Sequence, residues 1–185
     1  GILHSEDYRT GYANNLMKEL PRIPRVATYE QFMAFVEAGQ ELARLHVQFE
    51  DVELYTGVKI EFTKIGQPSY RVTQMKWGKI KGKTGNAAKD KTTLIYNDWI
   101  TVRNIPLEAQ EYVVNKKSAL DWVVERACVS IDKVSDIVND FNDYAADMGS
   151  ERYPLDLFLK VITVSLQTME IVKGLPKLEI HPLDK

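Results

Sequence analysis

The residues of this chain that are best suited to chemistry are cations gathered in one segment. Residues 70–91 contain seven basic residues and one acidic residue, Asp90, so the segment carries a net charge of +6. Lysines neutralise phosphate groups and release their counterions, and glycines let a backbone approach a ligand closely. This composition favours binding to a polyanion, although a mobile loop with its lysines in water would share it.

Two kinds of side chain in this segment could contact a nucleic acid. Lysines would follow the phosphates, while arginine, glutamine and asparagine can form paired hydrogen bonds with purine edges in the major groove. The residues predicted to contact double-stranded DNA are Arg71, Gln74, Lys76, Trp77, Lys79, Lys81, Lys83, Asn86, Lys89 and Lys91.

Catalytic and nucleotide-binding signatures are mostly absent. The segment from Gly78 to Thr84 looks like a phosphate-binding loop, but three residues separate Gly78 from Gly82 where the motif requires four. No apolar helix follows the segment to present amide groups to the phosphates. We therefore predict no catalytic residue and no bound cofactor in this chain.

Metal-binding patterns are weak as well. The three histidines, His4, His46 and His181, lack ligand spacing, and the single cysteine, Cys128, lies in an apolar run typical of a reduced core thiol in a cytoplasmic protein. Four aspartates could hold a hard cation, but the order and the glycine of an EF-hand loop are missing. A solvated region of capped turns is favoured for these four, which are Asp132, Asp136, Asp140 and Asp143. We predict no metal site.

Length and composition favour a single globular domain over residues 1–185. The chain has a net charge of -2 and is 44% hydrophobic, which excludes wholesale disorder. No apolar run is long enough to span a membrane. The chain starts with Gly1 rather than with methionine or a signal peptide, so we expect a piece of a longer protein.

Helical periods occur at both ends of the chain. Residues 7–20 predict a helix that ends at Pro21, so residues 1–24 form a leading helix and a proline-rich linker within the domain. Thr28 and Gln31 have the spacing of a capping box and predict a second helix from there to Phe49. After Pro106 the helical period predicts three more helices, at residues 107–114, 118–129 and 153–172, with Ser118 as an N-cap.

Alternating patterns between these helices predict strands. The four candidates are residues 58–65, 70–75, 92–96 and 99–102, and the Asn97-Asp98 pair is a plausible hairpin turn between the last two. The fold class is therefore α+β, with N-terminal helices, a small and mostly antiparallel sheet, and C-terminal helices.

Short strings of residues along nearly the whole chain occur in the order seen in one protein family. They are Tyr8-Arg9, Asn14 to Pro24, Ala38-Gly39, Leu42-Ala43, Leu45-His46, Ile95-Tyr96-Asn97, Ile100-Thr101-Val102, Ile105-Pro106, Tyr112 to Asn115, Lys117 to Leu120, Trp122, Asp132-Lys133, Ile137 to Asp140, Asn142, Arg152 to Leu155 and Leu175-Pro176. Together they resemble the C-terminal specificity domain of type ISP restriction-modification enzymes.

The resemblance implies a parent polypeptide that joins a nuclease, a helicase-like ATPase motor and an adenine-N6 methyltransferase. Its ATP, Mg²⁺ and S-adenosylmethionine would bind outside this chain, which would read the DNA target for methylation and cleavage. A structural domain that couples the methyltransferase to the motor is the alternative. Lys116 and Asp136 depart from the family, because glycine is expected at both positions.

Overall fold

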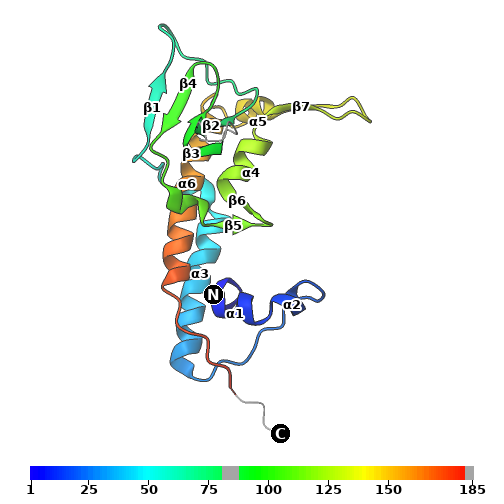
Figure 1. Cartoon of the computed structure of the whole chain (residues 1–185), viewed down its shortest axis with the longest axis vertical. Coiled ribbons are helices and arrows are strands. Elements are labelled where there is room, and N and C mark those ends of the chain that lie inside the picture. The colour runs from blue at the N-terminus through cyan, green and yellow to red at the C-terminus, as the bar shows by residue number, and fades with distance from the viewer. Residues whose placement is uncertain (81–87, 182–185) are drawn as a thin grey trace. The chain divides into compact units, whose positions relative to one another are not determined.

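The computed structural model describes residues 1–80 and 88–181 (Figure 1). The chain divides into two compact units, one formed by Gly1–Phe49 with Gln167–Lys185 and the other by Glu50–Leu166. Helices form most of the first unit, and an antiparallel sheet with covering helices forms the second. The predicted α+β class is confirmed.

The first unit begins with short helices. They are η1 (Ile2–His4), α1 (Glu6–Gly11) and α2 (Ala13–Leu16), followed by the long α3 (Tyr29–Val47) and the last turns of α6 (Tyr153–Lys173). The single helix predicted at residues 7–20 is wrong, because the chain leaves helical geometry at Tyr12, where φ is -109° and ψ is 16°. The predicted cap of α3 is confirmed, since Thr28 Oγ1 accepts the amide of Gln31 at 3.2 Å.

The core of the first unit holds the proline-rich segment in place. Tyr8 is buried, and its hydroxyl donates to the carbonyl of Arg22 at 2.9 Å. The segment after it pairs with the C-terminal residues, since Ala27 donates to the carbonyl of Glu179 at 2.8 Å. Within this unit, α3 lies alongside the last turns of α6 (Figure 1).

The second unit is built on a four-stranded sheet with the order β1-β4-β3-β2 and antiparallel neighbours. Its strands are β1 (Lys59–Phe62), β2 (Lys76–Ile80), β3 (Ala88–Ile95) and β4 (Ile100–Arg103). The predicted turn between β3 and β4 is confirmed, because Asn97 Oδ1 accepts the amides of Trp99 and Ile100 at 2.8 Å.

Residues 70–75 do not form the predicted strand, and side-chain amides satisfy part of their backbone instead. Asn142 accepts the amide of Val72 at 2.9 Å and donates to its carbonyl at 2.7 Å. Asn97 donates to the carbonyls of Ser69 and Arg71. The alternating pattern was misleading because these partners come from residues far along the chain.

The region after Pro106 also differs from its prediction. The expected helix at residues 107–114 is replaced by η3 (Leu107–Gln110) and by the hairpin of β5 (Val113–Val114) and β6 (Lys117–Ser118). Ser118 then caps α4 (Ala119–Arg126) as predicted, its Oγ accepting the amide of Asp121 at 3.1 Å. This helix ends three residues earlier than predicted, because residues 129–131 enter a strand.

The aspartate-rich region contains regular structure between its turns. A second small hairpin, β7 (Val129–Ile131) with β8 (Val138–Asp140), extends away from the sheet of its unit and leads into α5 (Phe141–Asp147) (Figure 1). Asp132 accepts the amides of Val134 and Ser135 in the hairpin turn, and Asp140 caps α5. The interpretation as capped turns is thus confirmed for these two carboxylates.

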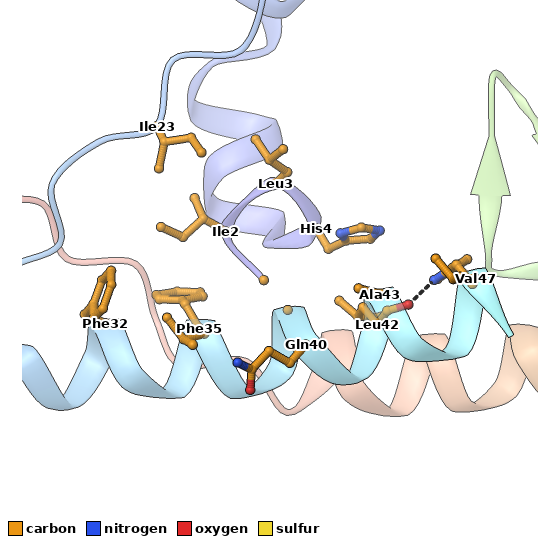
Figure 2. Close-up of a pocket in the computed structure, with 14 residues that line it drawn as sticks. Ile2, Leu3, His4, Ile23, Phe32, Phe35, Gln40, Leu42, Ala43 and Val47 are labelled. Atoms are coloured by element: carbon orange, nitrogen blue, oxygen red, sulfur yellow. Dashed lines mark hydrogen bonds between the residues drawn. The ribbon is translucent and has the colours of Figure 1, made fainter.

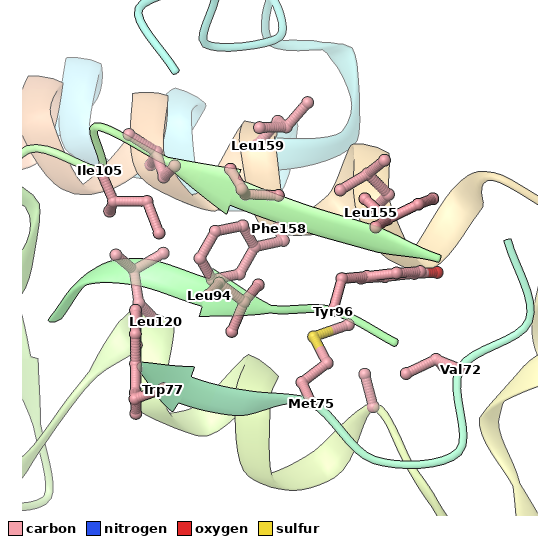
Figure 3. Packing of buried hydrophobic residues seen from close by; sticks show 14 of the residues in the cluster. Val72, Met75, Trp77, Leu94, Tyr96, Ile105, Leu120, Leu155, Phe158 and Leu159 are labelled. Carbon is pink, nitrogen blue, oxygen red and sulfur yellow. The ribbon is translucent and has the colours of Figure 1, made fainter. Parts of the chain in front are cut away.

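The sheet packs on α6 to form the core of the second unit. Leu155, Phe158 and Ile162 of α6 are fully buried against Leu94, Tyr96 and other sheet residues (Figure 3). The predicted extent of this helix is confirmed. None of the described helices is long and apolar enough to cross a membrane.

The two positions at which the resemblance leads us to expect glycine have left-handed backbone geometry. Lys116 has a φ of 69° and Asp136 a φ of 55°, and both lie in hairpin turns. A side chain with Cβ is strained in this region by about 1–2 kcal/mol, and glycine is not. Lys116 and Asp136 therefore each introduce local backbone strain in a hairpin turn.

We expect Lys116→Gly to stabilise the protein by about 0.5–1 kcal/mol, because relief of the strained φ exceeds the added entropy of the unfolded chain. The free energy of unfolding from urea titration measures the effect. Lys133→Gly is the matched control, since Lys133 has no positive φ, and it should leave stability unchanged or lower it. A loss of stability in Lys116→Gly would contradict the prediction.

Candidate nucleic-acid interface

The basic segment falls on β2 and β3, which pair in two different registers. Lys76 and Trp77 face Ile95 and Leu94, whereas Gly78, Lys79 and Ile80 face Asp90, Lys89 and Ala88. Residues 91–93 of β3 are therefore left without partners on β2, and we call them the β3 bulge. We call Lys76–Trp77 with Leu94–Ile95 the proximal part of the strand pair, and it contributes Trp77 and Leu94 to the core. Gly78–Ile80 with Ala88–Asp90 form the distal part, which lies beyond the bulge.

Close contact between the strands at the bulge requires glycine at position 78. A Cβ atom there would lie 3.0 Å from the Cβ of Thr93 and 3.2 Å from that of Asp90. On the other strand, the carboxylate of Asp90 accepts the amide of Thr92 at 3.0 Å and its hydroxyl at 2.6 Å. These hydrogen bonds lower the pKa of Asp90 and close the bulge locally.

A shared carboxylate joins the bulge to α4. Asp121 accepts the indole N–H of Trp77 at 2.8 Å and pairs with the ammonium of Lys91. The same ammonium lies 4.6 Å from the centre of the Trp77 ring. Burial raises the pKa of Asp121, but hydrogen bonds from Lys91, Trp77 and Ser118 outweigh it and hold the pKa below its ordinary value.

Three of the predicted contact residues remain available to a ligand. Lys76, Lys79 and Lys89 are exposed, and none of them forms an ion pair with a residue that the structure describes. Lys79 and Lys89 occupy facing positions in the distal part. Like charges at such positions repel, and the fold supplies no carboxylate within the described ranges to neutralise them.

The other predicted residues have different surroundings. Trp77 is 6% exposed and packs edge-on against Phe158, so its ring belongs to the core. Arg71 is exposed but pairs with Asp140. Gln74 is exposed, and its backbone forms an isolated antiparallel β-bridge with Cys128. Lys81, Lys83 and Asn86 lie outside the described residues.

Sequence reasoning missed the role of Asp121. It lies 30 residues from Lys91 and 44 from Trp77, so no local spacing points to it. Its place in the first turn of a capped helix was the only available signal, and many surface aspartates share it. Cys128 was predicted to be a core thiol, whereas it is only half-buried.

The first unit offers a second candidate site, an apolar pocket of about 660 Å³ on the side of α3 (Figure 2). Ile2, Leu3 and Phe32 are among its lining residues, and the polar ones are His4, Gln40 and His46. Burial, followed by the neighbouring His46, the N-terminal amine and Arg9, lowers the pKa of His4. The lining has no carboxylate or nucleophile, and no further chemistry follows from it.

Metal chemistry finds no support in the arrangement of side chains. Within residues 1–80 and 88–181, no group of three or more His, Cys, Asp or Glu residues is placed to hold an ion. Asp132 and Asp140 instead accept backbone amides, and Asp140 also pairs with Arg71.

Comparison with known proteins identifies a family. The family model described as the Type ISP C-terminal specificity domain matches residues 1–157. No curated protein sequence gives a significant match.

Solved structures are similar over almost the whole chain. A nuclease-deletion mutant of the Type ISP restriction-modification enzyme LlaGI, in complex with a DNA substrate mimic, is 39% identical with a TM-score of 0.81 over 98% of this chain. The ATP-dependent Type ISP enzyme LlaBIII bound to DNA is 36% identical with a TM-score of 0.80 over 96%. The DrdV–DNA complex is 28% identical with a TM-score of 0.74 over 97%. This chain spans only 16%, 11% and 17% of those three chains.

We expect the stabilisation contributed by Asp121 to be lost on acidification. Because its pKa is lowered on folding, its contribution is present above the unfolded value of about 3.9 and disappears as the pH falls through the folded value. The gap in the free energy of unfolding between wild type and Asp121→Asn should therefore narrow below about pH 4. Urea unfolding across this range measures it, with Asp147→Asn, an exposed position of α5, as the control. A constant gap would contradict the assignment.

Proposed function

The chain belongs to the family of Type ISP C-terminal specificity domains, and on that premise we propose that it recognises the DNA target of a larger restriction-modification polypeptide. It is a specificity domain rather than a catalytic one. Methylation of adenine N6 and ATP-dependent cleavage would take place in other domains, which would also hold S-adenosylmethionine, ATP and Mg²⁺.

The facing pair of Lys79 and Lys89 carries this proposal. Among the described residues of the second unit, seven other cations have carboxylate partners, namely Lys59, Lys64, Arg71, Lys91, Arg103, Lys117 and Arg152. An unneutralised pair at facing positions is unfavourable for the isolated fold and favourable beside a phosphate backbone. Two similar structures are described as bound to DNA and a third as bound to a DNA substrate mimic, which supports the same ligand class.

Sequence discrimination would come from neighbouring polar side chains. Arg71 and Gln74 are exposed and of types that read purine edges. Arg71 would have to exchange its partner Asp140 for a base, and Asp140 would keep its hydrogen bonds from the amide and the side chain of Asn142. Asn86, Lys81 and Lys83 remain predicted contacts outside the described residues.

We expect the double substitution Lys79→Ala with Lys89→Ala to weaken binding to all duplex sequences. The loss should be about tenfold per lysine near 0.1 M salt, and the slope of log K against log salt should fall by about 2. Fluorescence anisotropy with a labelled duplex of mixed sequence measures both quantities. Lys133→Ala removes an exposed lysine from the β7–β8 hairpin and serves as the control. Unchanged affinity of the double variant at low salt would overturn the proposed interface.

The β7–β8 hairpin favours a second function, coupling to another domain of the same polypeptide. Ile131, Val134, Ile137 and Val138 are 62%, 96%, 58% and 58% exposed. Asp132 and Asp136 lie among them, so the tip is apolar and acidic and unsuited to DNA. An apolar surface bordered by basic side chains would fit it. The apolar stripe of α6 does not offer a coupling surface along Leu155–Ile162, because it is buried within its own unit.

For coupling through the hairpin, we expect Val134→Ser with Ile137→Ser to increase hydrogen exchange of β7 and β8 in the longer polypeptide, because the docked surface would be released. DNA binding by the 185-residue chain should not change. Equal exchange rates in wild type and variant would contradict docking there.

Transfer of residues 69–91 between related full-length enzymes distinguishes the two functions. A changed methylation target supports recognition by this segment, since the contact residues move with it. An unchanged target together with lost assembly supports coupling instead.

A further inference from the structure

The distal part of the β2–β3 pair leaves the sheet at a defined joint. Trp77 and Leu94 belong to the core, whereas every described residue from Lys79 to Lys89 is exposed. The β3 bulge lies between these two parts, and bulges bend a strand and increase its twist. The direction of the distal lysines therefore depends on the geometry of the bulge.

Three independent contacts determine that geometry. The carboxylate of Asp90 accepts the amide and the hydroxyl of Thr92 within the bulge. At Gly78 an added Cβ atom would lie 3.0 Å from the Cβ of Thr93, so a side chain there would have to displace its neighbours by a few tenths of an ångström. Asp121, on a helix anchored in the core by the buried Leu120, holds the first bulge residue, Lys91. These three contacts restrict bending of the strand pair at the joint.

We infer that Gly78, Asp90 and Asp121 are positioning residues that set the angle at which the Lys79–Lys89 pair meets DNA, and so determine sequence discrimination. This inference rests on the proposed function. Phosphate contacts fix the orientation of a protein on the duplex and tolerate small displacements. The hydrogen bonds of Arg71 and Gln74 to base edges would depend on that orientation and tolerate little displacement. A loosened or shifted joint should therefore reduce discrimination more than overall affinity.

The pairing of Lys91 supports this assignment. Lys91 was predicted to contact phosphate, yet its ammonium is directed to Asp121 and to the ring of Trp77, and only a quarter of the side chain is exposed. Because Lys91 pairs with Asp121, its charge is not available to DNA and instead stabilises the joint. The two exposed lysines lie immediately beyond it.

The series Gly78→Ala and Gly78→Val tests the inference in the 185-residue chain. Each added methyl group must displace Thr93 or Asp90, so the distal strands should tilt progressively. Gly11→Ala is the matched control, because a Cβ at Gly11 meets nothing within 4 Å. Residual dipolar couplings of the amides of Lys79 and Lys89 report the tilt without DNA, and the indole N–H resonance of Trp77 reports that the core is intact.

DNA discrimination is measured as the ratio of affinities for a duplex selected from a random pool and for its scrambled version. We expect Gly78→Ala to lower this ratio about tenfold, with less than a twofold change in affinity for the scrambled duplex, and Gly11→Ala to change neither. Asp121→Asn should act in the same direction, and Asp98→Asn, which breaks the Lys64 ion pair, is its control.

Two results would overturn the inference. Unchanged dipolar couplings in both Gly78 variants would show that the bulge does not set the angle, whatever the DNA result. Equal losses for both duplexes would show that the joint only supports the fold. Failure of wild type to bind any duplex would instead remove the proposed function, and the inference with it, while the couplings would still report the joint.

Discussion

The carboxylate of Asp121 binds two donors and thereby connects α4 with the strands β2 and β3 of the second unit. The indole N–H of Trp77 lies in the core, and the ammonium of Lys91 lies at the edge of the core. Either group left without a partner would cost about 1–3 kcal/mol. Asp121 satisfies both from the first turn of α4, where a negative charge is favoured by the helix dipole. Sheet, helix and basic segment are therefore held at one point.

Positive charge serves two purposes in this unit. Cations that pair with carboxylates, such as Arg103 with Glu61 and Lys91 with Asp121, belong to the fold. Lys76, Lys79 and Lys89 do not pair within the described part of the chain and lie together on β2 and β3. The distinction is invisible in net charge, because a lysine contributes the same charge whether or not a carboxylate lies beside it. Only the unpaired set can attract a phosphate backbone at full strength.

Elements with a local physical cause were predictable. Thr28 and Ser118 begin helices because their side chains accept amides three residues later, and the turn at Asn97 forms for a similar reason. The period of α6 follows from its buried face. The helix predicted at residues 107–114 was wrong because a short hairpin takes up part of its backbone. The strand predicted at residues 70–75 was wrong because the side chain of Asn142, which lies 70 residues from Val72, binds its backbone instead. Distant partners leave no pattern in the segment that they hold.

Patterns along the chain were sufficient to predict the fold class, the main helices, the hairpin between β3 and β4, and the concentration of cations in residues 70–91, since each depends on neighbouring residues. The same patterns carried the resemblance to a family. Which cations are free of a carboxylate partner depends on tertiary contacts, because Asp140 and Asp121 reach Arg71 and Lys91 from remote elements. The same holds for the β3 bulge, whose register depends on contacts between strands and on a helix that follows them.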